Sequence, residues 1–371
     1  MGESGLAQAE PGSRKEGAVQ RSLPTTSPRA LATLIVAAVG ITAALLFGTA
    51  AANATPLGTN GLISYREYFD PSHSTGALFV VNPDGLTPGV QITNPGPGNL
   101  DTNQNWSPNG QQIVYEHDTA DGSSSIWIVD ALGGNPHEIL GCPGPNNPNP
   151  NCVVVTNPSW SPNGQWIAFE MVTGPFDQNG NPADDTIWAV HPTGLGLHQI
   201  THESPSGFSS DGNPQWSPDS SRIVFQHNEA PRFKASIWTA DSTTGGDQVR
   251  VSPPGVNGSD HPDYSPDGQW IMFRTDNGVP GSAKLMIAHP DGTALRILLD
   301  GSNRQSFFSS SFSPDGTGFT VGIAPGLGPD GNADVFVGHF DSHMRVDSLT
   351  NITRTNAWES SPRWGTHSLL P

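Results

Sequence analysis

The sequence has little positive charge. Lys and Arg contribute 16 of its 371 residues, against 34 Asp and Glu, for a formal net charge of −18. Proteins that bind nucleic acid or anionic membranes need basic surface that replaces the counterions of the phosphates. We therefore expect neither nucleic acid nor an anionic membrane surface as a partner. Cationic ligands and basic protein patches fit the charge better.

Charged residues of both signs are also scarce, at 13% of the chain, about half of the usual ~25%. Glycine and proline are abundant instead, with 43 and 35 residues. Long helical bundles and coiled coils need charged, glycine-poor helices. The composition therefore argues against them and favours many short strands joined by turns.

Cysteine is rare, and its two residues, Cys142 and Cys152, bracket the stretch PGPNNPNPN. In an oxidising compartment such a pair is expected to form a disulfide. It would close an 11-residue loop, which contributes roughly 3 kcal/mol in the chain-entropy treatment. A metal site is the weaker interpretation, because no second pair of soft ligands lies nearby in the sequence.

Long apolar runs are absent except near the N-terminus. Residues 1–29 are polar and basic, Leu31 to Phe47 carry no charge, and small residues follow as far as Ala52-Asn53-Ala54. This order is typical of an export signal. We predict a polar basic tail at 1–29, a signal peptide or N-terminal anchor at 30–54, and an exported domain at 55–371.

Cleavage after Ala54 would release this domain. An uncleaved segment would anchor it, because the apolar run is just long enough to span a bilayer. In either case basic residues before the apolar run favour export of the remainder. We expect the domain to be secreted, periplasmic or attached to the cell envelope, and to contact a membrane only through the N-terminal segment.

The rest of the chain is repetitive. Five segments are close copies, namely NWSPNGQQIVY, SWSPNGQWIAF, QWSPDSSRIVF, DYSPDGQWIMF and SFSPDGTGFTV. Their aromatic residues, together with a sixth in SPRWG, recur every 48 to 56 residues at Trp106, Trp160, Trp216, Tyr264, Phe312 and Trp364. In each copy the Ser-Pro-Asn/Asp-Gly sequence predicts a tight turn between two strands. A third and a short fourth strand follow, which is typical of a propeller blade.

These repeats predict an all-β fold, a six-bladed β-propeller of four-stranded blades. The first copy begins at its second strand, near Ile63, and the C-terminus supplies a lone first strand at Pro362 to Trp364. We therefore expect the ring to close by pairing the C-terminal strand with the N-terminal strands. Such closure hides sheet edges that would invite aggregation, and we expect a monomer held together by the six aromatic anchors.

The repeat P-x-W-S-P-D-G-x-x-I-x-F, followed by I-W-V and a D-G turn, resembles the TolB-type six-bladed propeller with its WD-repeat-like repeats. The resemblance covers residues 61–365. It implies the fold, whereas the family's functions range from the Tol–Pal envelope system to domains of prolyl oligopeptidase-like peptidases. We expect neither the N-terminal domain of TolB nor a peptidase domain in this sequence.

Polar residues stand one and three positions before each aromatic anchor, where alternation along a strand directs side chains into the central channel. The residues three before the anchors are Asn103, Asn157, Asn213, His261, Ser309 and Ser361. The residues one before are Asn105, Ser159, Gln215, Asp263, Ser311 and Arg363. Asp101, Asp211, Asp260 and Glu359 are expected near the channel mouth.

A water-filled channel needs polar walls, which accounts for this pattern without any function. The functional alternative is a ligand or metal site centred on His261 and Asp263. Its further candidate residues are Asp260, Asn103, Asn157, Asn213, Arg363 and Glu359.

Motifs for catalysis are lacking: G-x-S-x-G, H-E-x-x-H, a P-loop and C-x-x-C do not occur. We therefore predict no catalytic residues and no cofactor. The oxygen-rich segment with Asp177, Asn179, Asn181, Asp184 and Asp185 resembles the start of a calcium loop. Its Gly at position 6 and Glu at position 12 are missing, so a solvated hairpin is the main interpretation and calcium the alternative.

Together these features predict an exported, non-catalytic scaffold that binds a protein, a peptide or a cell-surface polymer. The alternative is a channel-centred, metal-dependent hydrolase, lactonase or lyase.

Overall fold

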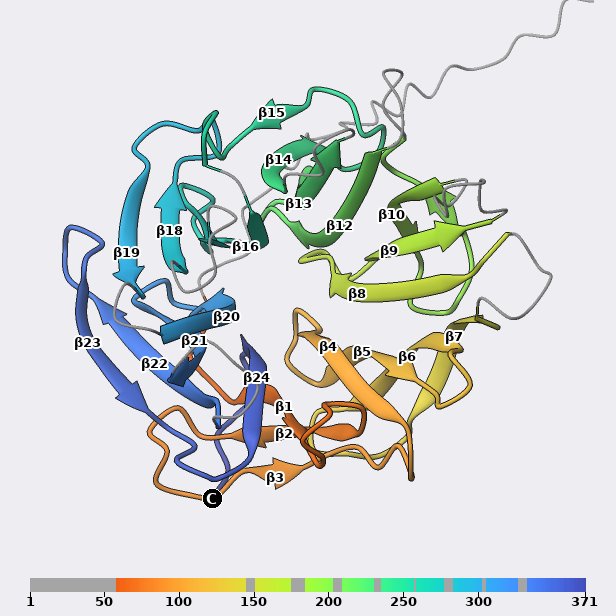
Figure 1. Ribbon diagram of the computed structural model, residues 1–371, viewed down its shortest axis with the longest axis horizontal. Helices are drawn as coiled ribbons and strands as arrows, with labels where there is room; N and C mark the ends of the chain where they lie inside the picture. Colours follow the sequence, from red (N-terminus) through yellow and green to blue (C-terminus); the bar gives the residue numbers. More distant parts are fainter. Residues whose placement is uncertain are drawn as a thin grey trace, which may run out of the picture. The chain divides into compact units, whose positions relative to one another are not determined.

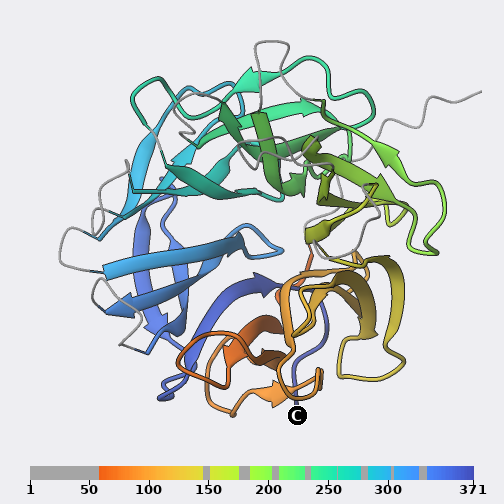
Figure 2. The ribbon, with the colours of Figure 1, turned by 45° about the vertical axis from the view of Figure 1, so that its right-hand side comes forward.

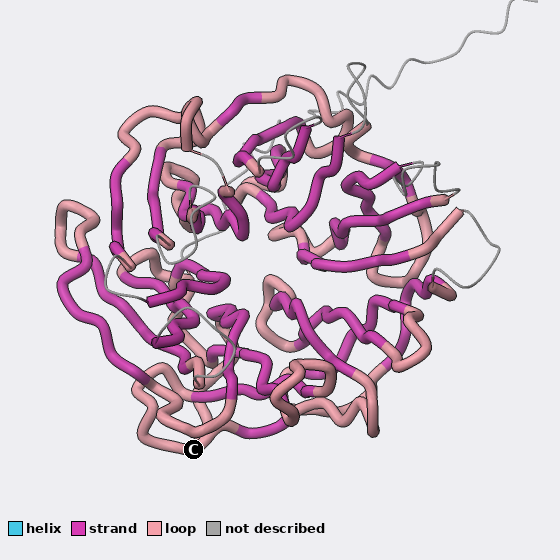
Figure 3. Tube along the Cα trace, in the orientation of Figure 1, coloured by secondary structure: helices cyan, strands magenta, loops and turns pink. Residues whose placement is uncertain are grey.

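The computed structural model describes residues 58–144, 151–174, 184–202, 209–229, 235–256, 258–276, 283–301, 305–325 and 332–371. The chain divides into two compact units, Met1–Thr49 and Ala50–Pro371, and all described residues belong to the second. Their regular structure is entirely β, with 24 strands and no helix (Figure 3). The all-β prediction is thus confirmed. The described part contains no helix that could span a membrane, and the predicted signal segment lies outside it.

Four of the five sheets contain four strands each, antiparallel and consecutive in the chain. The first two are β8 (Val154–Trp160), β9 (Ile167–Thr173), β10 (Asp184–Val190) and β11 (His198–Gln199), then β12 (Ser209–Trp216), β13 (Arg222–Glu229), β14 (Ser236–Asp241) and β15 (Val249–Arg250). The next two are β16 (Ser259–Tyr264), β17 (Ile271–Thr275), β18 (Lys284–Ala288) and β19 (Arg296–Asp300), then β20 (Gln305–Phe312), β21 (Gly318–Pro325), β22 (Asp334–Phe340) and β23 (Val346–Asn351).

The fifth sheet has eight strands in the order β24-β1-β2-β4-β5-β6-β7, with β3 paired to β2. They are β1 (Ile63–Tyr68), β2 (Gly76–Val81), β3 (Val90–Gln91), β4 (Leu100–Trp106), β5 (Gln112–Asp118), β6 (Ser124–Asp130), β7 (His137–Cys142) and β24 (Trp358–Trp364). A single parallel pair, Gly76 with Leu100, joins its two groups of four strands. The C-terminal strand β24 pairs antiparallel with β1, so the two ends of this unit share one sheet.

The sheets follow one another in a ring (Figure 1). The first strand of each group lies innermost, and these strands contact in the order β24, β4, β8, β12, β16, β20 and back to β24. The last strands of five groups, β3, β7, β15, β19 and β23, lie outermost, and the turned view shows the same succession (Figure 2). This is the arrangement of a β-propeller.

The aromatic anchors pack between neighbouring sheets. Trp160 lies in one apolar cluster with Val114 and Ile128 of the preceding strands. Trp216 likewise packs with Ala168 and Ala189 of the sheet before it. The repeat thus places one large aromatic ring at each of these junctions, which is where burial of apolar area stabilises the ring.

The innermost strands are not regular, contrary to the simple alternation assumed from the sequence. Each contains a register shift just before its anchor, as between Thr102 and Asn105 in β4. Asn103 in that bulge has φ 50°, and Asn157 and Asn213 repeat this with φ 53°. Asparagine tolerates this left-handed conformation better than most residues, so the bulge accounts for Asn at the position three before the anchor.

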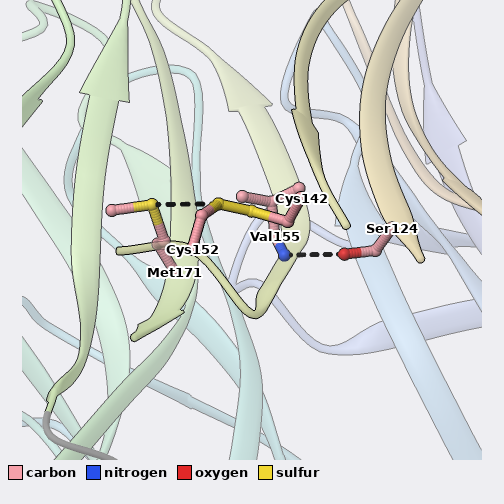
Figure 4. The surroundings of a disulfide bond; sticks show 5 residues. All are labelled: Ser124, Cys142, Cys152, Val155 and Met171. Carbon is pink, nitrogen blue, oxygen red and sulfur yellow. Dashed lines mark hydrogen bonds between the residues drawn. A yellow bond between two sulfur atoms is a disulfide. The ribbon is translucent and has the colours of Figure 1, made fainter. Parts of the chain in front are cut away.

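The predicted disulfide between Cys142 and Cys152 is confirmed (Figure 4). The two Cα atoms are 5.3 Å apart. The bond connects the end of β7 to the approach to β8, so it joins two neighbouring sheets. Beside it the Val155 N–H donates to Ser124 Oγ at 2.8 Å, a second link across the same junction.

Candidate functional site

The innermost strands and their following turns surround a cavity of about 260 Å³, which we call the funnel. Three kinds of residue line it in repeating order: the polar residue before each anchor, the anchor itself, and the proline of the turn. The polar residues are Asn105, Ser159, Gln215, Asp263, Ser311 and Arg363. The anchors are Trp106, Trp160, Trp216, Tyr264, Phe312 and Trp364, and the prolines are Pro108, Pro162, Pro218, Pro266 and Pro314.

Below the funnel the channel narrows to a second cavity of about 10 Å³, which we call the constriction. Gln215 and Arg363 line both cavities, so the two are adjacent along the channel. The constriction gathers Asn103, Asn157, Asn213, His261, Ser309 and Ser361. Its volume has room for about one water molecule, so the channel is narrow below the funnel.

Three polar residues of the funnel floor bond to one another and to the backbone. Gln215 Oε1 accepts hydrogen bonds from Asn105 Nδ2 at 3.2 Å and from Ser159 Oγ at 3.1 Å. Asn105 Oδ1 accepts the backbone N–H of Trp160 at 3.0 Å. We call the strands β4 to β15, which carry these residues, the amide half. Its floor is neutral, and its polar groups are used within the fold.

The opposite side of the floor carries charge. Asp263 Oδ2 accepts the backbone N–H of Phe312 at 2.8 Å, and Arg363 Nη1 donates to the carbonyl of Ser310 at 2.9 Å. The carboxylate of Asp263 and the guanidinium of Arg363 are thus each bonded to the backbone of β20, from the two neighbouring strands. Burial raises the pKa of Asp263 to about 6, although the charge of Arg363 opposes this. We call β16 to β24 the charged half.

The asparagines of the constriction are also engaged by the fold. Asn103 Nδ2 donates to Glu116 Oε2 at 2.7 Å, and Asn157 Nδ2 donates to Glu170 Oε2 at 3.2 Å. Asn213 Nδ2 similarly donates to Gln226 Oε1 at 3.2 Å. The acceptors were missed from the sequence.

A signal for these acceptors was present in the repeat. Glu116, Glu170 and Gln226 directly follow the aromatic residues Tyr115, Phe169 and Phe225 of the second strand. Alignment of the copies on this position would have identified the acceptors.

The remaining acidic candidates do not converge on either cavity. Asp260 Oδ2 lies 2.8 Å from Arg274 Nη1, and His261 Nδ1 lies 3.1 Å from Asp260 Oδ1. Glu359 is fully buried and accepts from Thr355 Oγ1 at 2.8 Å. Burial raises its pKa to about 7, with further contributions from nearby Asp334 and Glu67. Of the predicted ligand-binding residues, the funnel therefore contains Asp263 and Arg363.

Solved structures with this arrangement include TolB proteins. TolB from Acinetobacter baumannii has a TM-score of 0.61 at 19% identity, over 82% of this chain and 66% of that one. The putative TolB from Agrobacterium tumefaciens has a TM-score of 0.50 at 19% identity, over 82% and 99% of the two chains. A chain of a nidogen/laminin complex reaches 0.56 at 9% identity, over 84% and 100%.

The chain folds as a TolB-like β-propeller. At these identities the likeness establishes the fold alone. This TolB-like propeller chain spans 66% of the length of the Acinetobacter baumannii TolB. No family model and no curated protein matches the sequence.

The predicted calcium loop of the TolB-like propeller falls largely outside the described residues, which include neither Asp177, Asn179 nor Asn181. Asp185 is described, and it lies in β10 opposite Val172 of β9. Within the described ranges, no three His, Cys, Asp or Glu side chains are grouped so that they could hold a metal ion.

Proposed function

We propose that this chain is an exported six-bladed propeller that binds a protein or peptide partner in the funnel. The blade number follows if the eight-stranded sheet counts as two blades, since one residue pair joins its halves. Export is supported by the basic, apolar and A-x-A sequence before residue 55. The disulfide supports it too, because such bonds persist in oxidising compartments.

The observation that carries the proposal is the make-up of the funnel. Its walls are aromatic and its floor is polar with one acid and one arginine. Aromatic residues and arginine are enriched where protein interfaces gain most of their binding energy. The constriction has room for about one water molecule, so a side chain or chain end of a partner would enter the funnel and stop there. The nidogen/laminin complex supports protein partners for this fold in general.

The charge of the chain suggests the chemistry of the partner. A net charge of −18 favours a basic protein surface over an acidic one.

Chemistry on a substrate inside the channel is less well supported than binding at the funnel. A catalytic centre at the constriction would need room for a substrate, whereas the cavity there measures about 10 Å³.

The proposal is tested by photo-crosslinking from two positions of one hairpin. Gln111 is exposed in the turn that follows the funnel residue Pro108, and Ala120 is exposed beyond the other end of β5. A photo-crosslinking amino acid at each site is exposed to envelope extract from the source cells, and the products are identified by mass spectrometry. We expect one protein to be captured from Gln111 and not from Ala120.

The control is the same Gln111 probe in an Asp263→Asn/Arg363→Gln background. These substitutions keep polar groups on the floor and remove its charges. Loss of the captured protein would support binding in the funnel. Capture from Ala120 alone, or capture that ignores the floor substitutions, would contradict the proposal.

A further inference from the structure

A third cavity, of about 780 Å³, lies apart from the funnel and shares no lining residue with it. We call it the side cleft. It is formed by β3 and the segment after it, by β4 to β6, and by the turn after β6. Its lining residues are Gln91, Ile92, Thr93, Asn94, Pro95, Asp101, Tyr115, His117, Trp127, Val129, Gly134 and Pro136. A volume of this size is in the range of small-molecule sites, ~300–1,000 Å³.

A buried acid orients a histidine in the side cleft. Asp101 is 1% exposed, and its Oδ1 lies 2.6 Å from His117 Nδ1. The two residues are direct partners across β4 and β5. A carboxylate accepts hydrogen bonds, so the proton of neutral His117 belongs on Nδ1, and Nε2 is left as an acceptor. Nε2 makes none of the hydrogen bonds found among the described residues, and His117 lines the cleft.

Trp127 provides an aromatic wall beside this acceptor. Its ring centroid lies 5.7 Å from that of His117. Its indole N–H donates to Ser125 Oγ at 2.9 Å, so the ring is held in place and its polar group is used. A fixed aromatic surface next to a hydrogen-bond acceptor matches a ring that has an apolar face and hydroxyl donors at its edge.

The charge of the side cleft limits the kinds of ligand that it can bind. The Asp101 carboxylate lies in its wall, and the whole chain carries a net charge of −18. Both disfavour an anionic ligand. We propose that the side cleft binds a neutral sugar residue, with His117 Nε2 accepting from a hydroxyl group and Trp127 against the apolar face.

The fold supplies a matched control in another sheet. His227 Nδ1 lies 2.6 Å from Asp211 Oδ1, and Trp238 lies 5.4 Å from His227 with its indole bonded to Ser236. The same arrangement therefore occurs twice, but the side cleft includes only the first copy. A purely structural role predicts the same consequences at both sites. A ligand site predicts a difference between them.

The experiment uses the full-length chain in a detergent without a sugar headgroup. The probes are cellobiose and N,N′-diacetylchitobiose, with glucuronic acid as the anionic comparison, and binding is followed by saturation-transfer NMR and titration. His117→Asn keeps a donor toward Asp101 and removes the Nε2 acceptor, and His227→Asn is its counterpart. We expect a neutral disaccharide to bind, His117→Asn to weaken it about tenfold, and His227→Asn to leave it unchanged.

Thermal melting accompanies the titrations, and we expect both variants to lose similar stability. Trp127→Leu should also weaken binding, whereas Trp238→Leu should not. The proposal is overturned if neither disaccharide binds or if His117→Asn binds like the parent. It is equally overturned if both histidine variants lose binding alike, or if glucuronic acid binds better than the neutral probes.

Discussion

The two halves of the channel are built from the same repeat, yet they use their polar residues differently. In the amide half each constriction asparagine donates to an acceptor on the second strand of its own sheet, and the floor residues bond to one another. In the charged half Asp263 and Arg363 are bonded to the backbone of β20 and present charge to the funnel. Polar residues of the repeat thus form hydrogen bonds within the fold in the amide half, whereas in the charged half two of them present charge to the funnel.

This difference separates two explanations of a polar channel. Polar walls that satisfy one another stabilise the ring and need no ligand. Asp263 and Arg363 form no direct ion pair among the described residues, so each presents a charge that a partner can neutralise. The amide half fits the first explanation, and the charged half fits the second.

The largest expected effect should be the same in both halves, because both depend on aromatic anchors. Trp216 and Phe312 are 8% and 4% exposed and pack between sheets. Replacing either with Ala should cost about 3–5 kcal/mol, since a large ring leaves a cavity. Chemical unfolding of Trp216→Ala and Phe312→Ala measures this. An anchor variant as stable as the parent would show that the halves differ in packing as well as in polar groups.

The sequence predicted the parts of this comparison that depend on spacing. Turns and aromatic residues recur at near-constant intervals, so the all-β propeller and the grouping of the polar positions around one channel could be expected. The Cys142–Cys152 bond followed from a two-cysteine chain.

The partners of the polar residues depend on strand register, which spacing leaves open. Across β4 and β5, Thr102 pairs with Glu116 and Asp101 pairs with His117. This register results from the bulge before Asn105. Without that bulge, simple alternation would make Asn103 and Asn105 equivalent, with both side chains facing the same part of the channel. The funnel and the constriction could not be told apart from the sequence for this reason.

A second effect should be confined to the amide half. The Cys142–Cys152 bond joins β7 to the approach to β8, and the charged half has no counterpart in the described residues. Replacing both cysteines with Ser should cost roughly 3 kcal/mol, by loosening the unfolded chain. Equilibrium unfolding in denaturant is the measurement, with a reduced sample of the parent as control. Unchanged stability would mean that the Val155–Ser124 link holds this junction without the disulfide.

A smaller effect concerns a buried carboxylate of the amide half. Burial and nearby Asp185 raise the pKa of Glu170. The folded state therefore holds a proton that the unfolded state releases above pH ~4.3, so stability falls as pH rises through the folded pKa. Glu170→Gln keeps an acceptor for Asn157 and removes this dependence. We expect equal stability near pH 4 and a gain of about 1–2 kcal/mol for the variant at pH 9.

Melting curves between pH 4 and pH 9 measure the difference. Glu138→Gln is a matched control, since Glu138 is exposed on β7. If the stability of Glu170→Gln equals that of the parent at every pH, the charge of the Glu170 carboxylate is already neutralised by its surroundings.

The smallest effect on stability is expected from the same kind of substitution in the charged half. Asp263→Asn keeps an oxygen that can accept the Phe312 N–H, and it removes a carboxylate whose pKa burial raises to about 6. The parent should lose stability between pH ~4 and pH ~6, because the folded state binds a proton there that the unfolded state has released. The variant should lack that slope.

Its gain above pH 6 should stay below that of Glu170→Gln, because Arg363 then loses the favourable charge of Asp263. Binding should respond in the opposite sense, since the variant removes the acid that the funnel presents to a basic partner. A large stability change with unaltered partner capture would assign Asp263 to the framework and make the charged half equivalent to the amide half. A flat stability profile with lost capture would keep the two halves distinct, one for structure and one for binding.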